Sequence, residues 1–284
     1  MQLLALKTVL AAVDLDGSSR AALTSARDLA NAAGAALHVL HVASAEGRGD
    51  AARRELEQSG VTPDHTRMHL AVGDAAHAIT LTADKVHADV IVLGPHRERA
   101  GRDRASPLGA TALSVVTNAS APCLVAATPL RIPVVHVVAA VDLSDSDRGT
   151  LGVALSWASA LRARHAQPIA LTALHVMNAS SPAESAKRSR ALENALAPIR
   201  SEAGEWAGIT LQMKVITADG PAAGIASYVD ANAPGLVALG TRGLGVDPVG
   251  RLGSVASDVM RRIETPVLLV PPAMWNEFAR GAAT

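Results

Sequence analysis

The sequence predicts an α/β protein made of two similar halves, each an open parallel five-stranded sheet with helices on both faces. Three observations predict this. The short apolar runs are continuous rather than alternating, which is typical of strands buried on both sides. Ala-rich stretches with apolar residues at helical spacing separate these runs. The same order of strand and helix patterns occurs twice along the 284 residues.

The first strand of each half ends in an aspartate. An apolar run at 8–13 is closed by Asp14, and a second run at 135–141 is closed by Asp142. A turn rich in Ser and Asp follows in both halves and supplies N-cap residues for the next helix. Ligands of open parallel sheets bind beyond the carboxyl ends of the strands, where the strand order reverses. Both aspartates stand at the ends of such strands.

The later elements repeat in the same order. The second strand ends in His-Val in both halves, with Val42 in the first and Val176 in the second. Helical patterns follow at 51–60 and 182–206. The remaining strands are expected at 66–72, 90–94 and 121–125 in the first half, and at 210–217, 236–240 and 265–270 in the second.

The repeat predicts two domains. The first is expected to span residues 1–129 and the second residues 133–272, with a join between two prolines and a short tail at 273–284. The second half is longer because its middle helical segment is longer.

Composition excludes several classes of protein. Lys+Arg and Asp+Glu both number 26, so the formal net charge is zero and no basic excess points to nucleic acid. The single cysteine, Cys123, sits in an apolar run and is expected to be a small buried residue. No apolar run approaches the ~18 residues that a membrane helix requires, and the start does not look like a signal peptide. We expect a cytoplasmic protein.

One glycine-rich loop leaves the fourth strand of the second half. Gly240 and Gly243 are followed, after nine residues, by Gly253-Ser254 at the start of a helical pattern. Glycines let a ligand approach the main chain, and a helix N-terminus offers free N–H groups to phosphate. The loop has neither the Lys of a Walker A loop nor the glycine spacing of a dinucleotide fingerprint. Glycine content alone fits an ordinary surface loop.

The spacing of this loop, together with Asp142, the His-Val pair and the last strand Thr-Pro-Val-Leu-Leu-Val, resembles the universal stress protein family in a tandem form. The resemblance implies an adenine nucleotide alpha hydrolase-like, flavodoxin-like fold that binds ATP, with or without Mg²⁺, in the second half. Asp142 would bind the adenine edge and the Val176 backbone would contact the base. Gly240 and Gly243 would line the path of the ribose and phosphates. The phosphates would meet Gly253, Ser254 and Val255. The resemblance also implies that the last strands of the two halves pair inside the chain, which would leave either a monomer or a homodimer.

The first half departs from the family pattern. Gly94 is present, but Arg97 replaces the second glycine, the spacing to Gly109 is longer, and an alanine follows Gly109. Asp14 and Val42 keep the adenine end. A weaker or empty site at Asp14, Val42, Gly94 and Gly109 is therefore expected.

Other chemistry finds little support. No nucleophile with a base is evident, and His65 and His69 lack a third metal ligand. We predict a nucleotide-dependent sensor or regulator of the stress response with no dedicated catalytic residues and no metal site. The alternatives are an interaction protein that binds no nucleotide, a slow ATPase, and a binder of another small ligand.

Overall fold

A computed structural model describes residues 4–14, 19–43, 66–95, 108–143, 147–162, 167–178, 181–202, 208–242 and 251–274. It is an α/β structure, as the sequence predicted. The described elements of the first half are β1 (Thr8–Ala12), α1 (Arg20–Ala33), β2 (Ala36–Ala43), β3 (Thr66–Val72), α3 (Ala75–Val86), β4 (Val90–Leu93), α4 (Ala110–Asn118) and β5 (Cys123–Val125).

The second half repeats this order. Its elements are β6 (His136–Val141), α5 (Asp147–Arg162), β7 (Ile169–Met177), α6 (Pro182–Glu202), β8 (Ile209–Thr217), α7 (Pro221–Asn232), β9 (Leu236–Gly240), α8 (Ser254–Arg262) and β10 (Val267–Val270). The helix predicted at 51–60 lies outside the described residues.

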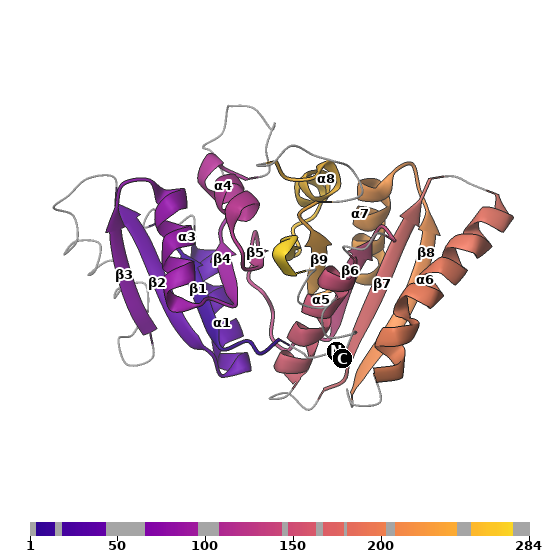
Figure 1. The fold of residues 1–284 in the computed structure, drawn as a ribbon, viewed down its shortest axis with the longest axis horizontal. Helices are drawn as coiled ribbons and strands as arrows, with labels where there is room; N and C mark the ends of the chain where they lie inside the picture. Colours follow the sequence, from indigo (N-terminus) through magenta and orange to yellow (C-terminus); the bar gives the residue numbers. More distant parts are fainter. Residues whose placement is uncertain are drawn as a thin grey trace.

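All ten strands form one sheet, in the order β3-β2-β1-β4-β5-β10-β9-β6-β7-β8 (Figure 1). Neighbouring strands are parallel within each half. The join is antiparallel, because β10 pairs with β5 in the register Val267↔Val125 to Leu269↔Cys123. The two predicted five-stranded sheets are thus continuous, and the expected internal pairing of the last strands is confirmed.

Helices cover both faces of this sheet, and each face has one core. On one face α1 and α5 bury residues such as Leu29 and Leu155, and on the other face α3, α4, α7 and α8 bury residues such as Val115 and Val259. Each of these two apolar clusters contains residues of both halves. The cores therefore run through the join without a break.

Candidate functional site

The strand order places three of the predicted residues along one edge of the sheet. In the second half, β6 lies between β7 and β9, so the strand order reverses between β6 and β9. Asp142 directly follows β6, and Gly240 is the last residue of β9. Val176 lies near the carboxyl end of β7, the neighbour of β6 on its other side. Parallel strands bring these ends together, at the position where such sheets bind ligands.

A histidine fixes the ends of β6 and β7 relative to each other. The Nδ1 atom of His175 lies 2.9 Å from the carbonyl oxygen of Val141, the residue before Asp142. Because a carbonyl only accepts, this nitrogen carries the proton and donates it. The same bond occurs in the first half, where His41 Nδ1 lies 3.0 Å from the Val13 carbonyl. The sequence showed the repeated His-Val pair but did not predict these hydrogen bonds, although the repeat was the available signal.

Backbone contacts bring the start of α8 against the end of β9. Thr241 is buried and donates its N–H to Val270 at 2.9 Å, while its carbonyl accepts the N–H of Gly253 at 2.9 Å. A Cβ atom at Gly253 would stand 3.2 Å from that carbonyl oxygen, and one at Gly240 would stand 3.0 Å from the carbonyl oxygen of Arg242. A side chain at either position would crowd the neighbouring main chain, so glycine favours this close approach.

The N-terminus of α8 is left without a side-chain cap. Gly253 is its N-cap residue, and the first turn contains no acidic residue. Ser254 and Val255 are exposed there, so N–H groups at the positive end of the helix dipole face outward. Arg251, also exposed, adds positive charge two residues before the cap. These groups can bind an anion. Gly243, predicted to line the same path, lies outside the described residues.

The floor of the site beside Val176 is closely packed. Val176 is 9% exposed, and a Cβ added at Gly224 of α7 would stand only 2.4 Å from its Cγ1 atom. A glycine at this position lets α7 rest directly on the end of β7. Asp142 is half-buried, so its carboxylate is only partly exposed to solvent. The sequence did not identify Gly224, or the buried Thr150 hydroxyl close to Gly240.

Comparison with known proteins identifies the group to which this architecture belongs. The family model described as the universal stress protein family matches residues 45–127 and 134–271. The chain belongs to the universal stress protein family. No curated protein matches it.

Three solved structures are similar over nearly the whole chain. A Pseudomonas aeruginosa UCBPP-PA14 protein assigned to the universal stress proteins is 16% identical, with a TM-score of 0.68 and 99% of each chain covered. A functionally unknown protein of P. aeruginosa PAO1 is also 16% identical, with a TM-score of 0.65 and 98% of each chain covered. A universal stress protein of Archaeoglobus fulgidus DSM 4304 is 17% identical, with a TM-score of 0.60 and coverage of 93% of this chain and 96% of the other. At these identities the likeness concerns the fold.

The first half of this universal stress protein has the same framework. Asp14 is exposed after β1, and its N–H donates to the Ser19 hydroxyl at 2.9 Å. Val42 is half-buried near the end of β2, and Gly94 directly follows β4. Gly109 caps α4, again with no side-chain cap and no acidic residue in the first turn. Arg97 lies outside the described residues, so the expected weakness of this site stays a prediction.

Among the described residues of this family member, no three His, Cys, Asp or Glu side chains gather as metal ligands would. His69 contacts His38 on the neighbouring strand, 2.9 Å from nitrogen to nitrogen, and His65 is outside the described residues. No helix in the described part of the chain is long and apolar enough to span a membrane.

Proposed function

We propose that this universal stress protein binds an adenine nucleotide, ATP with or without Mg²⁺, at the carboxyl edge of its second half. One observation carries the proposal. The uncapped N-terminus of α8 is hydrogen-bonded to the end of β9 through Gly253 and Thr241, at the reversal of strand order between β9 and β6, the strand that Asp142 follows. This arrangement offers N–H donors to phosphates and a carboxylate to the base within one site.

Each residue has a role in this proposal. Asp142 accepts a hydrogen bond from the adenine amino group, and the backbone of Val176 contacts the base. Gly240 and Gly243 leave room for the ribose and phosphates. Ser254 and Val255 present N–H groups and a hydroxyl to the phosphate oxygens, while Gly253, whose N–H donates to the Thr241 carbonyl, lets the main chain approach them. The exposed Arg251 strengthens the attraction for an anion.

The site in the second half brings together N–H donors, a carboxylate and closely packed main chain. Such groups bind and orient a nucleotide, whereas hydrolysis also needs a positioned base or water-activating group. We infer that the bound nucleotide acts as a signal and that the protein is a regulator in the stress response. Release of inorganic phosphate from ATP near the background rate over hours is the expected result. Turnover on the scale of minutes would favour an ATPase.

Thermal unfolding with and without ATP and Mg²⁺ tests the binding. A ligand at 100 times its Kd stabilises the folded state by about 2.7 kcal/mol. About 2–4 °C per kcal/mol is typical at this size, so Tm should rise by several degrees. Asp142→Ala should remove most of this rise, whereas Asp14→Ala, the matched change in the first half, should keep it. No rise at millimolar ATP in protein freed of nucleotide would end the proposal.

The two glycine loops provide a second matched pair. Gly243→Arg copies the residue that the first half carries at position 97 and should abolish the rise in Tm, because a side chain would occupy the phosphate path. Arg97→Gly makes the reverse change and should leave ATP binding by the second half unchanged. If Arg97→Gly changed the rise in Tm as much as Gly243→Arg, the assignment of the principal site to the second half would be wrong.

A further inference from the structure

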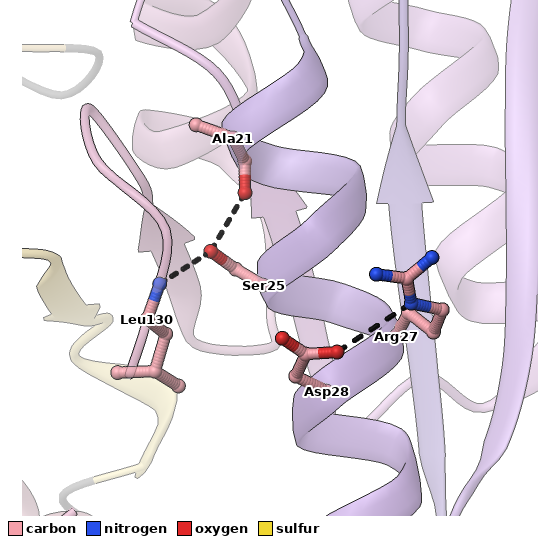
Figure 2. A network of polar contacts seen from close by, with 5 residues as sticks. All are labelled: Ala21, Ser25, Arg27, Asp28 and Leu130. Carbon is pink, nitrogen blue, oxygen red and sulfur yellow. Dashed lines mark hydrogen bonds and ion pairs between the residues drawn. The ribbon is translucent and has the colours of Figure 1, made fainter. Parts of the chain in front are cut away.

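Each half has a segment before its first strand that packs on the other half. We call residues 4–7, which precede β1, the first arm, and residues 126–135, which precede β6, the second arm. The N–H of Leu4 donates to the Ser156 hydroxyl of α5 at 3.0 Å. The N–H of Leu130 donates to the Ser25 hydroxyl of α1 at 2.8 Å (Figure 2). In each bond, a backbone N–H of one arm donates to a serine hydroxyl on a helix of the other half.

The two serines are arranged alike. Ser25 donates its hydroxyl proton to the carbonyl of Ala21, four residues earlier, at 2.7 Å, and Ser156 donates to Gly152 in the same way at 2.8 Å. With the proton used inside the helix, a lone pair of each oxygen remains for an arm N–H. Ser25 is 0% exposed and Ser156 is 2% exposed. Loss of either hydroxyl would leave a backbone donor without its partner.

Apolar contacts accompany these bonds. Leu6 of the first arm and Leu130 of the second are both buried, and both belong to the core cluster on the α1 and α5 face. Trp157, next to Ser156, is part of that cluster too. The second arm is also tied to the second half, because the Thr128 hydroxyl donates to the Glu264 carbonyl at 2.9 Å. Each arm therefore joins the two halves.

The paired strands at the join give a reason why the arms matter. β5 and β10 pair over only three residue positions, Cys123 to Val125 against Val267 to Leu269. The strand pairing at the join is therefore short, and the apolar cluster that both halves share on the α1 and α5 face contains Leu6 and Leu130 of the arms. We propose that the two arms form a reciprocal latch that makes the halves one cooperative unit, so that neither unfolds while the other stays folded.

The hydrogen bonds of the two arms differ in how deeply they are buried. The bond to Ser25 is buried, whereas the bond to Ser156 is partly buried and the first arm forms one wall of a cleft of about 1030 Å³. A donor beside a cleft reaches water more easily when its partner is removed. Ser25→Ala should therefore destabilise the protein more than Ser156→Ala.

The tryptophans permit a direct test on the full chain. Trp157, Trp206 and the single tyrosine lie in the second half and Trp275 lies in the tail that follows it, so tryptophan fluorescence reports mainly on the second half. Far-ultraviolet circular dichroism follows both halves. In urea without nucleotide, the two curves of the unaltered protein should coincide, as they do for a single cooperative transition. Separate curves would overturn the proposal. This measurement does not depend on ATP binding.

Variants of the two serines test whether the latch causes the cooperative unfolding of the two halves. Ser25→Ala and Ser156→Ala should each lower the urea midpoint, Ser25→Ala by about 0.5 M. The double variant should separate the two curves. The matched control is Thr80→Ala with Thr117→Ala, which removes hydroxyls that donate to the Ala76 and Leu113 carbonyls in the same way within helices of the first half. The control curves should shift together. Coincident curves in the double latch variant would contradict the proposal.

Labelling of Cys123 gives a second measurement if the double variant does not fold. This thiol is buried on β5 at the join. Ser25→Ala should speed its labelling by a thiol reagent below the unfolding range at least several-fold relative to Thr80→Ala. Equal rates in the two single variants would overturn the latch.

Discussion

His38 and His69 meet nitrogen to nitrogen on β2 and β3. The distance from His38 Nδ1 to His69 Nε2 is 2.9 Å, the ring planes differ by 8°, and the centroids are 5.1 Å apart. Two imidazole rings that lie in one plane and meet nitrogen to nitrogen have their centroids about this far apart. The two rings therefore share a plane and do not lie over one another. One proton lies between the two nitrogens. A metal ion has no room between two nitrogens that share a proton at this distance.

This pair should make stability depend on pH. Burial, and then the charge of the other ring for His38 and of Lys85 for His69, lower both pKa values from 6.5, with Arg67 acting in the same direction. A folded-state pKa below the unfolded value means that the folded protein binds fewer protons. Stability is therefore complete above pH 6.5 and falls as the pH drops through the lowered values. Urea midpoints between pH 5 and 8 measure this.

Variants separate the pair from the other histidines. His69→Gln should flatten the acid-side loss of stability, whereas His77→Gln, at an exposed position on α3, should keep the slope. Burial also lowers the pKa of His136, so a residual slope should remain in His69→Gln. If His69→Gln kept the full dependence of stability on pH, the histidine pair would be excluded as the cause of that dependence.

Cys123 should be inert in the folded protein. Burial raises the pKa of its thiol to about 12. Only the thiolate reacts, so a thiol reagent at pH 8 should label the folded chain orders of magnitude more slowly than the chain in urea. Fast labelling under native conditions would mean that the join between β5 and β10 opens readily.

At the scale of elements, α7 and α3 differ at their fourth residue. Gly224 of α7 touches Val176, whereas α3 has Ala78 at that place. Gly224→Ala gains up to about 1 kcal/mol of helix propensity but forces a methyl group into occupied space, which commonly costs about 1–3 kcal/mol. A net loss of stability is expected, together with weaker ATP binding because the Val176 backbone would shift.

The mirror variant is the control for this prediction. Ala78→Gly should cost about 1 kcal/mol through helix propensity alone and should leave ATP binding unchanged. Urea unfolding and the rise of Tm with ATP measure both effects. A stabilised Gly224→Ala would show that α7 can move away from β7 at little cost.

Local pattern predicted most elements within one or two residues. The strands expected at 66–72 and 236–240 are confirmed with those bounds. The strand expected at 121–125 begins only at Cys123, because Pro122 has no N–H for the ladder. The link from Thr241 to Gly253 and the contact of Gly224 with Val176 were not predicted, since they join residues that no local period relates.

At the scale of the whole molecule, the internal repeat predicted two sheets, and the family resemblance implied their pairing through the last strands. It did not predict the crossing arms, because Ser25 and Ser156 look like ordinary helix residues and their partners lie more than a hundred positions away. The helix expected at 51–60 and the part of the glycine loop around Gly243 fall outside the described residues and stay predictions.

The join supports a prediction about the whole chain. Leu124 and Leu268 face each other across it, and both are 0% exposed. Leu124→Ala should lower the free energy of unfolding by about 2–5 kcal/mol through lost burial and a cavity. The loss should appear equally in fluorescence and circular dichroism during urea unfolding. A loss of stability seen by circular dichroism but not by fluorescence would mean that the halves unfold separately.

The sheet order also decides how copies of this chain can associate. With the last strands paired internally, the strands at the two ends of the sheet are β3 and β8, which occupy equivalent places in the two halves. A seam between β3 of one copy and β8 of the next would leave the same two strands free again and grow into a filament. Arg67 on β3 and Lys214 on β8 are exposed, and their like charges oppose that growth. Pairing of the last strands inside the chain thus leaves β3 and β8 as the described edges where copies could join, and one basic side chain on each edge opposes that contact.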